Sequence, residues 1–235
     1  MRVLCIPGMR WRNTTWIAFL ALMSLPLVSQ EGGKAAALPA TVTFTLDFPQ
    51  SNPAHYSIAV EATGHAVYEC TAKVAEDSED QHYRAEFDVS PENRERIFSW
   101  AKQAQYFAGK IDSGNAKLAF TGAKILSYQD GQRSNTARYN YSNLGPVREL
   151  TNLFQSVAGT LEYGRRLAYY HRYQKLALDD ELKRMEAQAK NNELSEIQGL
   201  SPVLLEIVED PSVINGVRAR AQAVMKMGSV SSRGH

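Results

Sequence analysis

Hydrophobic and polar positions alternate through much of the chain between residues 41 and 89. In the first such segment, Val42, Phe44 and Leu46 fall on one side and Thr43 and Thr45 on the other. This two-residue period is typical of a strand with one buried face. A Thr63-Gly64 pair separates two of the segments and indicates a hairpin. The predicted strands are residues 41–48, 56–62, 65–74 and 82–89.

A second hairpin is predicted around Asp130-Gly131, a dipeptide that favours a tight two-residue turn. Placing this dipeptide at the centre of the turn pairs Gln129 with Gln132. It predicts one strand that begins near residue 118 and a second that ends near residue 141. On this register, residues 118, 120, 126 and 128 share a face with residues 137, 139 and 141.

Helical spacing of apolar residues occupies most of the remaining chain. Ser90-Pro91 is a helix-start signal, and the helix that follows is expected to end near Gly109. A long helix is predicted from Pro146 to Tyr173, with a possible kink at Gly159 or Gly164 because glycine weakens helices. Further helices are predicted at residues 179–189, 195–208 and 212–227.

This order of elements predicts an α+β fold: an antiparallel sheet of about six strands with helices packed on one face, plus a helical C-terminal extension. The strands do not alternate singly with helices, which argues against a parallel doubly wound sheet. We expect an α+β domain at residues 41–174, a helical extension at 175–227 and a disordered tail at 228–235.

The N-terminus is typical of a secretory signal peptide. Ile17–Val28 is apolar, follows Arg10 and Arg12, and is too short for the roughly 20 residues of a membrane span. We therefore expect a signal peptide at residues 1–30, a mature start between 30 and 41, and a periplasmic or extracellular protein without a transmembrane span. Retention of this segment as an anchor is the alternative.

Charge and cysteine content limit the classes of partner and the disulfide bonds expected for the chain. Formal net charge is +1, and loss of residues 1–30 removes three arginines and no acids, leaving 23 − 25 = −2. This balance does not favour nucleic acid as a partner. Cys70 is then the single cysteine, so an internal disulfide is impossible, and its strand position predicts a buried apolar role.

The residues give no pattern that predicts a cofactor or a catalytic site. The histidines lack the spacing of a zinc helix. The acidic run Glu76–Asp80 lacks the glycine and ligand spacing of a calcium loop and is better interpreted as a solvated loop. No nucleophile motif is present. Whether the chain is an enzyme stays open on this evidence.

Residues 163–175 combine tyrosines and basic side chains at helical spacing. One interpretation is a binding face for an acidic partner, a lipid headgroup or a glycan. The other, which we favour, is a core-facing tyrosine stripe with a solvated basic side. The candidate partner-binding residues are Tyr163, Arg165, Arg166, Tyr170, His171, Arg172 and Tyr173.

Two segments resemble known families. Residues 197–225 resemble one HEAT-type helical hairpin, with Pro202 opening the first helix, Asp210-Pro211 in the turn, and Val213, Val217, Arg218 and Ala221 in the second helix. That resemblance implies protein–protein contact and carries no catalytic residues. Residues 41–170 resemble exported bacterial α+β domains of unknown function through the hairpin pattern Tyr56, Ile58, Val60, then Gly64, Ala66 and Tyr68.

The sequence therefore favours an exported, non-enzymatic protein that binds another protein or associates with the cell envelope. The C-terminal helices are the expected contact surface, for a partner or for a second copy of the chain. Two alternatives remain open at this point: a hydrolase with an unrecognised site, and a carrier that holds a small ligand on the face of the sheet.

Overall fold

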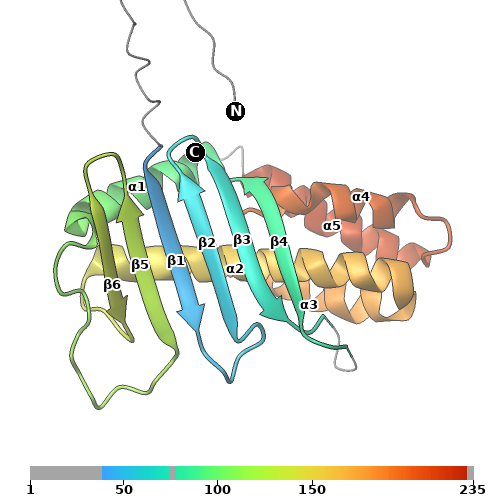
Figure 1. Ribbon diagram of the computed structural model, residues 1–235. Coiled ribbons are helices and arrows are strands. Elements are labelled where there is room, and N and C mark those ends of the chain that lie inside the picture. The colour runs from blue at the N-terminus through green and yellow to red at the C-terminus, as the bar shows by residue number, and fades with distance from the viewer. Residues whose placement is uncertain (1–38, 75–77, 232–235) are drawn as a thin grey trace, which may run out of the picture. The chain divides into compact units, whose positions relative to one another are not determined.

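The computed structural model describes residues 39–74 and 78–231, which form one antiparallel sheet and a set of helices (Figure 1). The sheet order is β4-β3-β2-β1-β5-β6, with every pair of neighbours antiparallel. The strands are β1 (Thr41–Asp47), β2 (His55–Glu61), β3 (His65–Ala72), β4 (Gln81–Asp88), β5 (Ala123–Gln129) and β6 (Ser134–Tyr139). The helices are α1 (Pro91–Gln103), α2 (Gly145–Tyr173), α3 (Leu178–Lys190), α4 (Ser201–Glu209) and α5 (Asn215–Ser231), with short 3-10 turns η1 (Gln105–Phe107), η2 (Lys175–Ala177) and η3 (Ile197–Leu200).

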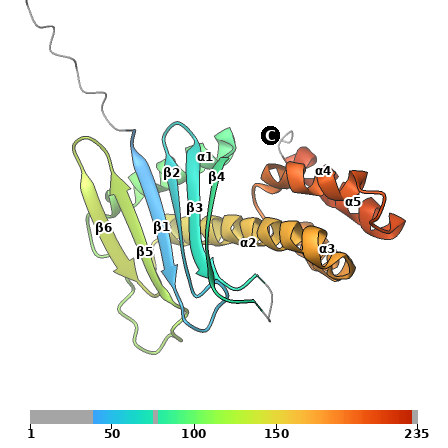
Figure 2. The same cartoon turned by 45° about the vertical axis from the view of Figure 1, so that its right-hand side comes forward.

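The predicted α+β fold is confirmed. Helices α1 and α2 cover one face of the sheet, as both views show (Figures 1 and 2). The alternation in the sequence decides which face this is, because Val42, Phe44 and Leu46 are buried while the threonines between them are not. The Phe44 ring stacks on Phe154 of α2, with ring centroids 5.4 Å apart, and so fastens the central strand to the long helix.

The register of the β5–β6 hairpin differs from the predicted one by two residues. Gln129 pairs with Ser134, and the turn runs from Asp130 to Arg133. Asp130 is therefore the first turn residue, because its carboxylate accepts hydrogen bonds from the backbone N–H groups of Gln132 (2.7 Å) and Arg133 (2.6 Å). An even shift keeps each side chain on its predicted face, so Tyr128 and Tyr139 are both buried.

The strand that enters this hairpin begins later than predicted. Leu118 and Phe120 precede β5 and are 39% and 59% exposed, so they do not belong to the buried face. Gly122 marks the start of the strand with φ at +98°. A Cβ atom there would lie 2.8 Å from both Leu46 Cδ1 and Phe48 Cβ, which explains a glycine at this position.

Helix α1 is also shorter than predicted, ending at Gln103 instead of near Gly109. Gln105, Tyr106 and Phe107 all have positive φ, which redirects the chain. Phe107 enters the core and the Tyr106 ring packs on Tyr128 at 4.5 Å between centroids. Burial of the Phe107 ring and packing of the half-buried Tyr106 ring offset the cost of the left-handed backbone.

Helix α2 belongs to two hydrophobic cores. Its N-terminal half, including Leu150 and Phe154, packs on the sheet, whereas Tyr163 and Leu167 join a second core with α3, α4 and α5. The predicted kink is absent, since α2 is a single helix through both glycines. Gly164 instead admits Leu200, whose Cδ2 would lie 2.5 Å from a Cβ at that position.

The C-terminal region contains the predicted helical hairpin, formed by α4 and α5 with buried Leu204, Ile207 and Val217 between them. The predicted tail is partly helical, because α5 continues through residues 228–231 and Gly228 packs against Ile197. Residues 232–235 and the predicted signal peptide at 1–30 lie outside the described residues. Among the helices that are described, none has the length and hydrophobicity to cross a bilayer.

Candidate functional site

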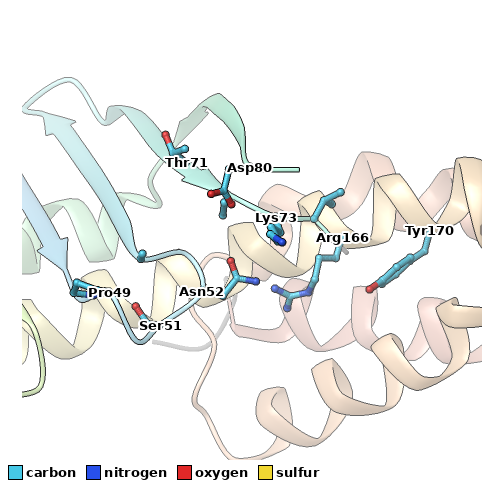
Figure 3. Close-up of a pocket in the computed structure, with 11 residues that line it drawn as sticks. Pro49, Ser51, Asn52, Thr71, Lys73, Asp80, Arg166 and Tyr170 are labelled. Atoms are coloured by element: carbon cyan, nitrogen blue, oxygen red, sulfur yellow. The ribbon is translucent and has the colours of Figure 1, made fainter. Parts of the chain in front are cut away.

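A cavity lies where the sheet, the β1–β2 loop and α2 meet (Figure 3). Its volume is about 550 Å³. Antiparallel topology brings the ends of β1 and β3 to this edge of the sheet, and α2 crosses behind the sheet (Figure 1). The lining residues that matter below are Ser51, Asn52, Thr71, Lys73, Asp80, Arg166 and Tyr170.

The β1–β2 loop is fixed by hydrogen bonds. The Phe48 N–H donates to the Ala54 carbonyl at 2.7 Å, which closes the loop. The Ser51 hydroxyl makes contacts of 2.8 Å with the Phe48 carbonyl and 2.7 Å with the Pro53 carbonyl. Ser51 therefore shapes the loop, and the neighbouring Asn52 directs its amide towards the cavity (Figure 3).

Arg166 faces Asn52 from the opposite wall and is held there by acids of the helical core (Figure 3). Its Nε donates to Glu181 Oε1 at 2.5 Å, and its Nη1 lies 3.8 Å from Glu162 Oε2. Glu181 is fully buried. A guanidinium with a buried partner on one edge keeps a fixed orientation and can present its remaining N–H groups to a ligand.

Behind this wall lies a buried polar network centred on Glu162. Arg165 donates to Glu162 from Nε and Nη2, the latter at 2.6 Å, and also to the Lys73 carbonyl at 2.9 Å. Glu162 further accepts from the Tyr68 hydroxyl at 2.8 Å and from Cys70 Sγ at 3.4 Å. The network ties α2 to β3 through polar contacts that burial makes strong.

The network keeps its thiol and phenol protonated. Burial, followed by the charge of Glu162, raises the pKa of Cys70 to about 11. The same two causes raise the pKa of Tyr68 well above its ordinary value. Cys70 is 2% exposed, so it occupies the buried position predicted for it and is not activated as a nucleophile.

A second cavity of about 280 Å³ adjoins the first along α2 and shares Ser51, Asn52 and Arg166 with it. Its other polar lining includes Tyr56, Gln155 and Gln188. Burial raises the pKa of Tyr56 far above the physiological range, so this hydroxyl stays neutral. We call the two cavities together the α2 groove. The groove offers hydrogen-bond donors, acceptors and one anchored cation along its length.

The seven predicted partner-binding residues do not form one surface. Arg166 and Tyr170 line the larger cavity, and Tyr163 lines the smaller one. Arg165 is buried in the Glu162 network. His171 bonds Asp210 at 2.9 Å, which joins α2 to the C-terminal hairpin. The Arg172 guanidinium stacks near Tyr173, which is 62% exposed.

Several site residues escaped prediction. Glu162 is spaced i, i+3 and i, i+4 from the two arginines, which is the one local signal for an ion pair. Glu181 and Asn52 carry no local signal because tertiary packing alone brings them to Arg166. Within the described residues no three histidine, cysteine or acidic side chains cluster as metal ligands. Glu76 and Asp77 of the acidic run lie outside those residues.

Comparison with known proteins adds no family. No protein-family model matches the chain, and no curated protein matches it.

Proposed function

We propose that this chain is an exported binding module that holds a polar segment of another protein in the α2 groove, without catalysing a reaction. The observation that carries the proposal is the placement of Arg166. Its guanidinium lines both cavities of the groove, and a buried carboxylate on α3 fixes it there. Preorganised cations of this kind favour recognition because little side-chain entropy is lost on binding.

The shape and charge of the groove favour a chain segment over a compact ligand. The two cavities follow one another along α2, so an occupant that fills both is elongated. Lys73 and Arg166 supply positive charge, and Asp80 supplies negative charge at the rim. The Glu162 carboxylate also lines the smaller cavity, where its charge is paired with Arg165. Neutral donors and acceptors from Asn52, Gln155 and Gln188 match the alternating polar groups of a peptide backbone.

Two further observations support this class of function. The apolar run preceded by arginines at the N-terminus favours export. The α4–α5 hairpin has the residue pattern that resembles a HEAT repeat, a family that makes protein contacts, and leaves Leu205 and Ile214 44% and 67% exposed. A second contact through these helices, with a partner or with another copy of the chain, would extend the same interface.

The proposal is tested by site-specific photo-crosslinking in cells that express the full chain. A crosslinker replaces Asn52, and the captured protein is identified by mass. We expect capture to fall at least about fivefold in a Tyr170→Ala, Lys73→Ala background, because both side chains line the groove. The matched control is Thr136→Ala, Arg138→Ala on the outer side of β6, which should leave capture unchanged.

Two outcomes would overturn the proposal. One is equal capture in the groove variant and the control; the other is capture from Leu205 or Ile214 but not from Asn52, which would move the interface to the C-terminal helices. Export is tested separately by fractionation of the wild-type chain and a Leu20→Arg variant. We expect the wild type outside the cytoplasm and the variant retained within it.

A further inference from the structure

A third cavity, of about 360 Å³, lies near the other end of α2, where β6 leads into the helix. The residues between Tyr139 and Gly145 and the first turns of α2 form its walls. Its volume is within the range of small-molecule sites, which begins at about 300 Å³. The side chains that carry the inference are Lys124, Tyr141, Arg148, Glu149, Asn152 and Gln155.

Lys124 is the unusual member of this set. The side chain is 5% exposed, and its ammonium bonds neutral oxygens alone: Thr121 Oγ1 at 2.9 Å and the carbonyls of Asn140, Thr121 and Gly122 at 3.0, 3.2 and 3.4 Å. No carboxylate of the described chain lies within ion-pair distance. Burial lowers the pKa of Lys124, with no acid to offset it.

Arg165 of the Glu162 network differs from Lys124 in having a counter-ion. It is about as buried as Lys124, but its guanidinium lies 2.6 Å from the Glu162 carboxylate. A buried cation without a counter-ion is costly, whereas an anion that enters the cavity gains an ammonium already freed from bulk water. The cavity wall therefore favours a negatively charged ligand group beside Lys124.

The charges of the wall set the charge of that ligand. Lys124 and Arg148 contribute +2 and Glu149 contributes −1, so the wall carries 2 − 1 = +1. A monoanionic carboxylate balances this value better than a phosphate dianion, which is usually held by several cations. Asn152 and Gln155 are exposed amides one helical turn apart, and Tyr141 offers a ring that is 42% exposed.

We propose that this cavity binds a small hydroxylated carboxylate, such as a sugar acid. The carboxylate lies beside Lys124 Nζ and replaces the longest of its four contacts, that with the Gly122 carbonyl. The amides of Asn152 and Gln155 bond the hydroxyl groups, and the Tyr141 ring covers one face of the ligand. This site is separate from the larger cavity, shares Gln155 with the smaller cavity of the groove, and is argued without reference to the proposed protein partner.

The test is calorimetric titration of the full chain with sodium D-glucuronate at constant ionic strength. Glucose, which has the same ring without the carboxylate, is the matched control ligand. We expect saturable binding of glucuronate and binding of glucose roughly tenfold to a hundredfold weaker, the factor carried by one charge-assisted hydrogen bond. Glucuronate binding should weaken as pH rises through the lowered pKa of Lys124.

Variants decide whether Lys124 binds a ligand or only fastens the loop at Thr121 to β6. Lys124→Met should lose glucuronate binding, whereas Lys117→Met, at an exposed lysine of the same loop, should keep it. Because Lys124→Met can also unfold the loop, Glu149→Gln provides a second readout at an exposed position. It removes the one negative charge of the wall and should tighten binding severalfold.

Three results would overturn the proposal. The first is equal affinity for glucose and glucuronate. The second is the absence of saturable glucuronate binding up to about 10 mM, which is a weak limit for any specific site. The third is unchanged glucuronate affinity both in Glu149→Gln and in a Lys124→Met variant that is folded.

Discussion

Glu162→Gln tests whether the buried network holds the sheet to α2. In the wild-type chain the Glu162 carboxylate accepts from Arg165, Tyr68 and Cys70, and both members of the ion pair are at most 7% exposed. Glutamine keeps the size and one acceptor oxygen but removes the negative charge. Arg165 then stays buried with the Lys73 carbonyl as its remaining strong acceptor.

The expected cost follows from this uncompensated charge. Breaking a buried pair by removing one partner destabilises proteins by about 3–5 kcal/mol. For a chain of this size each kcal/mol lowers Tm by about 2–4 °C, so we expect a fall of roughly 6–20 °C. Urea unfolding followed by circular dichroism measures the free energy, and an unchanged m value would show that the folded state is otherwise intact.

The control is an ion pair of similar geometry at the surface. Glu86 accepts from Arg84 at 2.9 Å on β4, where both side chains are about half exposed. Glu86→Gln should change the free energy of unfolding by less than about 1 kcal/mol. If Glu162→Gln costs no more than this control, the network does not stabilise the fold and our reasoning is wrong. A Glu162→Gln, Arg165→Met pair should show coupling, because the stranded charge is removed with its partner.

Two further predictions concern single positions. Cys70 should react with a thiol reagent at pH 8 only as fast as the chain unfolds, and rapid labelling of the folded chain would contradict this. The folded state keeps the thiol protonated to a higher pH than the unfolded state does. The free energy of unfolding of the wild type relative to Cys70→Ala should therefore fall as pH rises from about 9 to about 11. Gly122→Ala should destabilise the fold by about 1–3 kcal/mol, because φ is positive there and the new Cβ would meet Leu46 and Phe48. Gly131→Ala should be nearly neutral, because a Cβ at that position meets open space. Thermal unfolding measures both effects, and equal effects would refute the packing argument.

Most of the strand pattern could be predicted because burial on one face imposes a two-residue period. Strands β1 to β4 begin and end within two residues of their predicted limits. The register of β5 and β6 could not be predicted from Asp130-Gly131 alone. The dipeptide identifies the turn but does not say whether Asp130 is its first or its second residue, and that choice depends on side-chain hydrogen bonds.

The candidate site was harder to predict because its charges are paired across long sequence distances. The basic run was expected to have a solvated side, yet Arg165 and Arg166 bond buried acids, and His171 bonds an acid of the C-terminal hairpin. Glu181 and Asp210 lie on other elements. Local spacing identifies a helix face, but only tertiary packing decides whether an arginine on that face meets solvent or a carboxylate.

A better sequence signal for the candidate sites is the polar face of α2, on the side away from its apolar stripe. Residues 147, 150, 154, 157 and 161 face the sheet core. Residues 148, 152, 155, 159, 162, 166 and 170 form a second stripe at spacings of three and four, and every one of them lines a cavity. Gln155 belongs both to the groove and to the Lys124 cavity.

The three cavities therefore form one row along a single helix face, at the edge of the sheet where β1, β3 and β6 end. A helix that builds two cores cannot vary its apolar stripe without cost. Apart from Glu162, which the buried network holds, its polar stripe is under less of that constraint, and the arginines and amides found there are the side chains that recognise polar ligands. The long helix thus supports the fold with one face and supplies both proposed binding sites with the other.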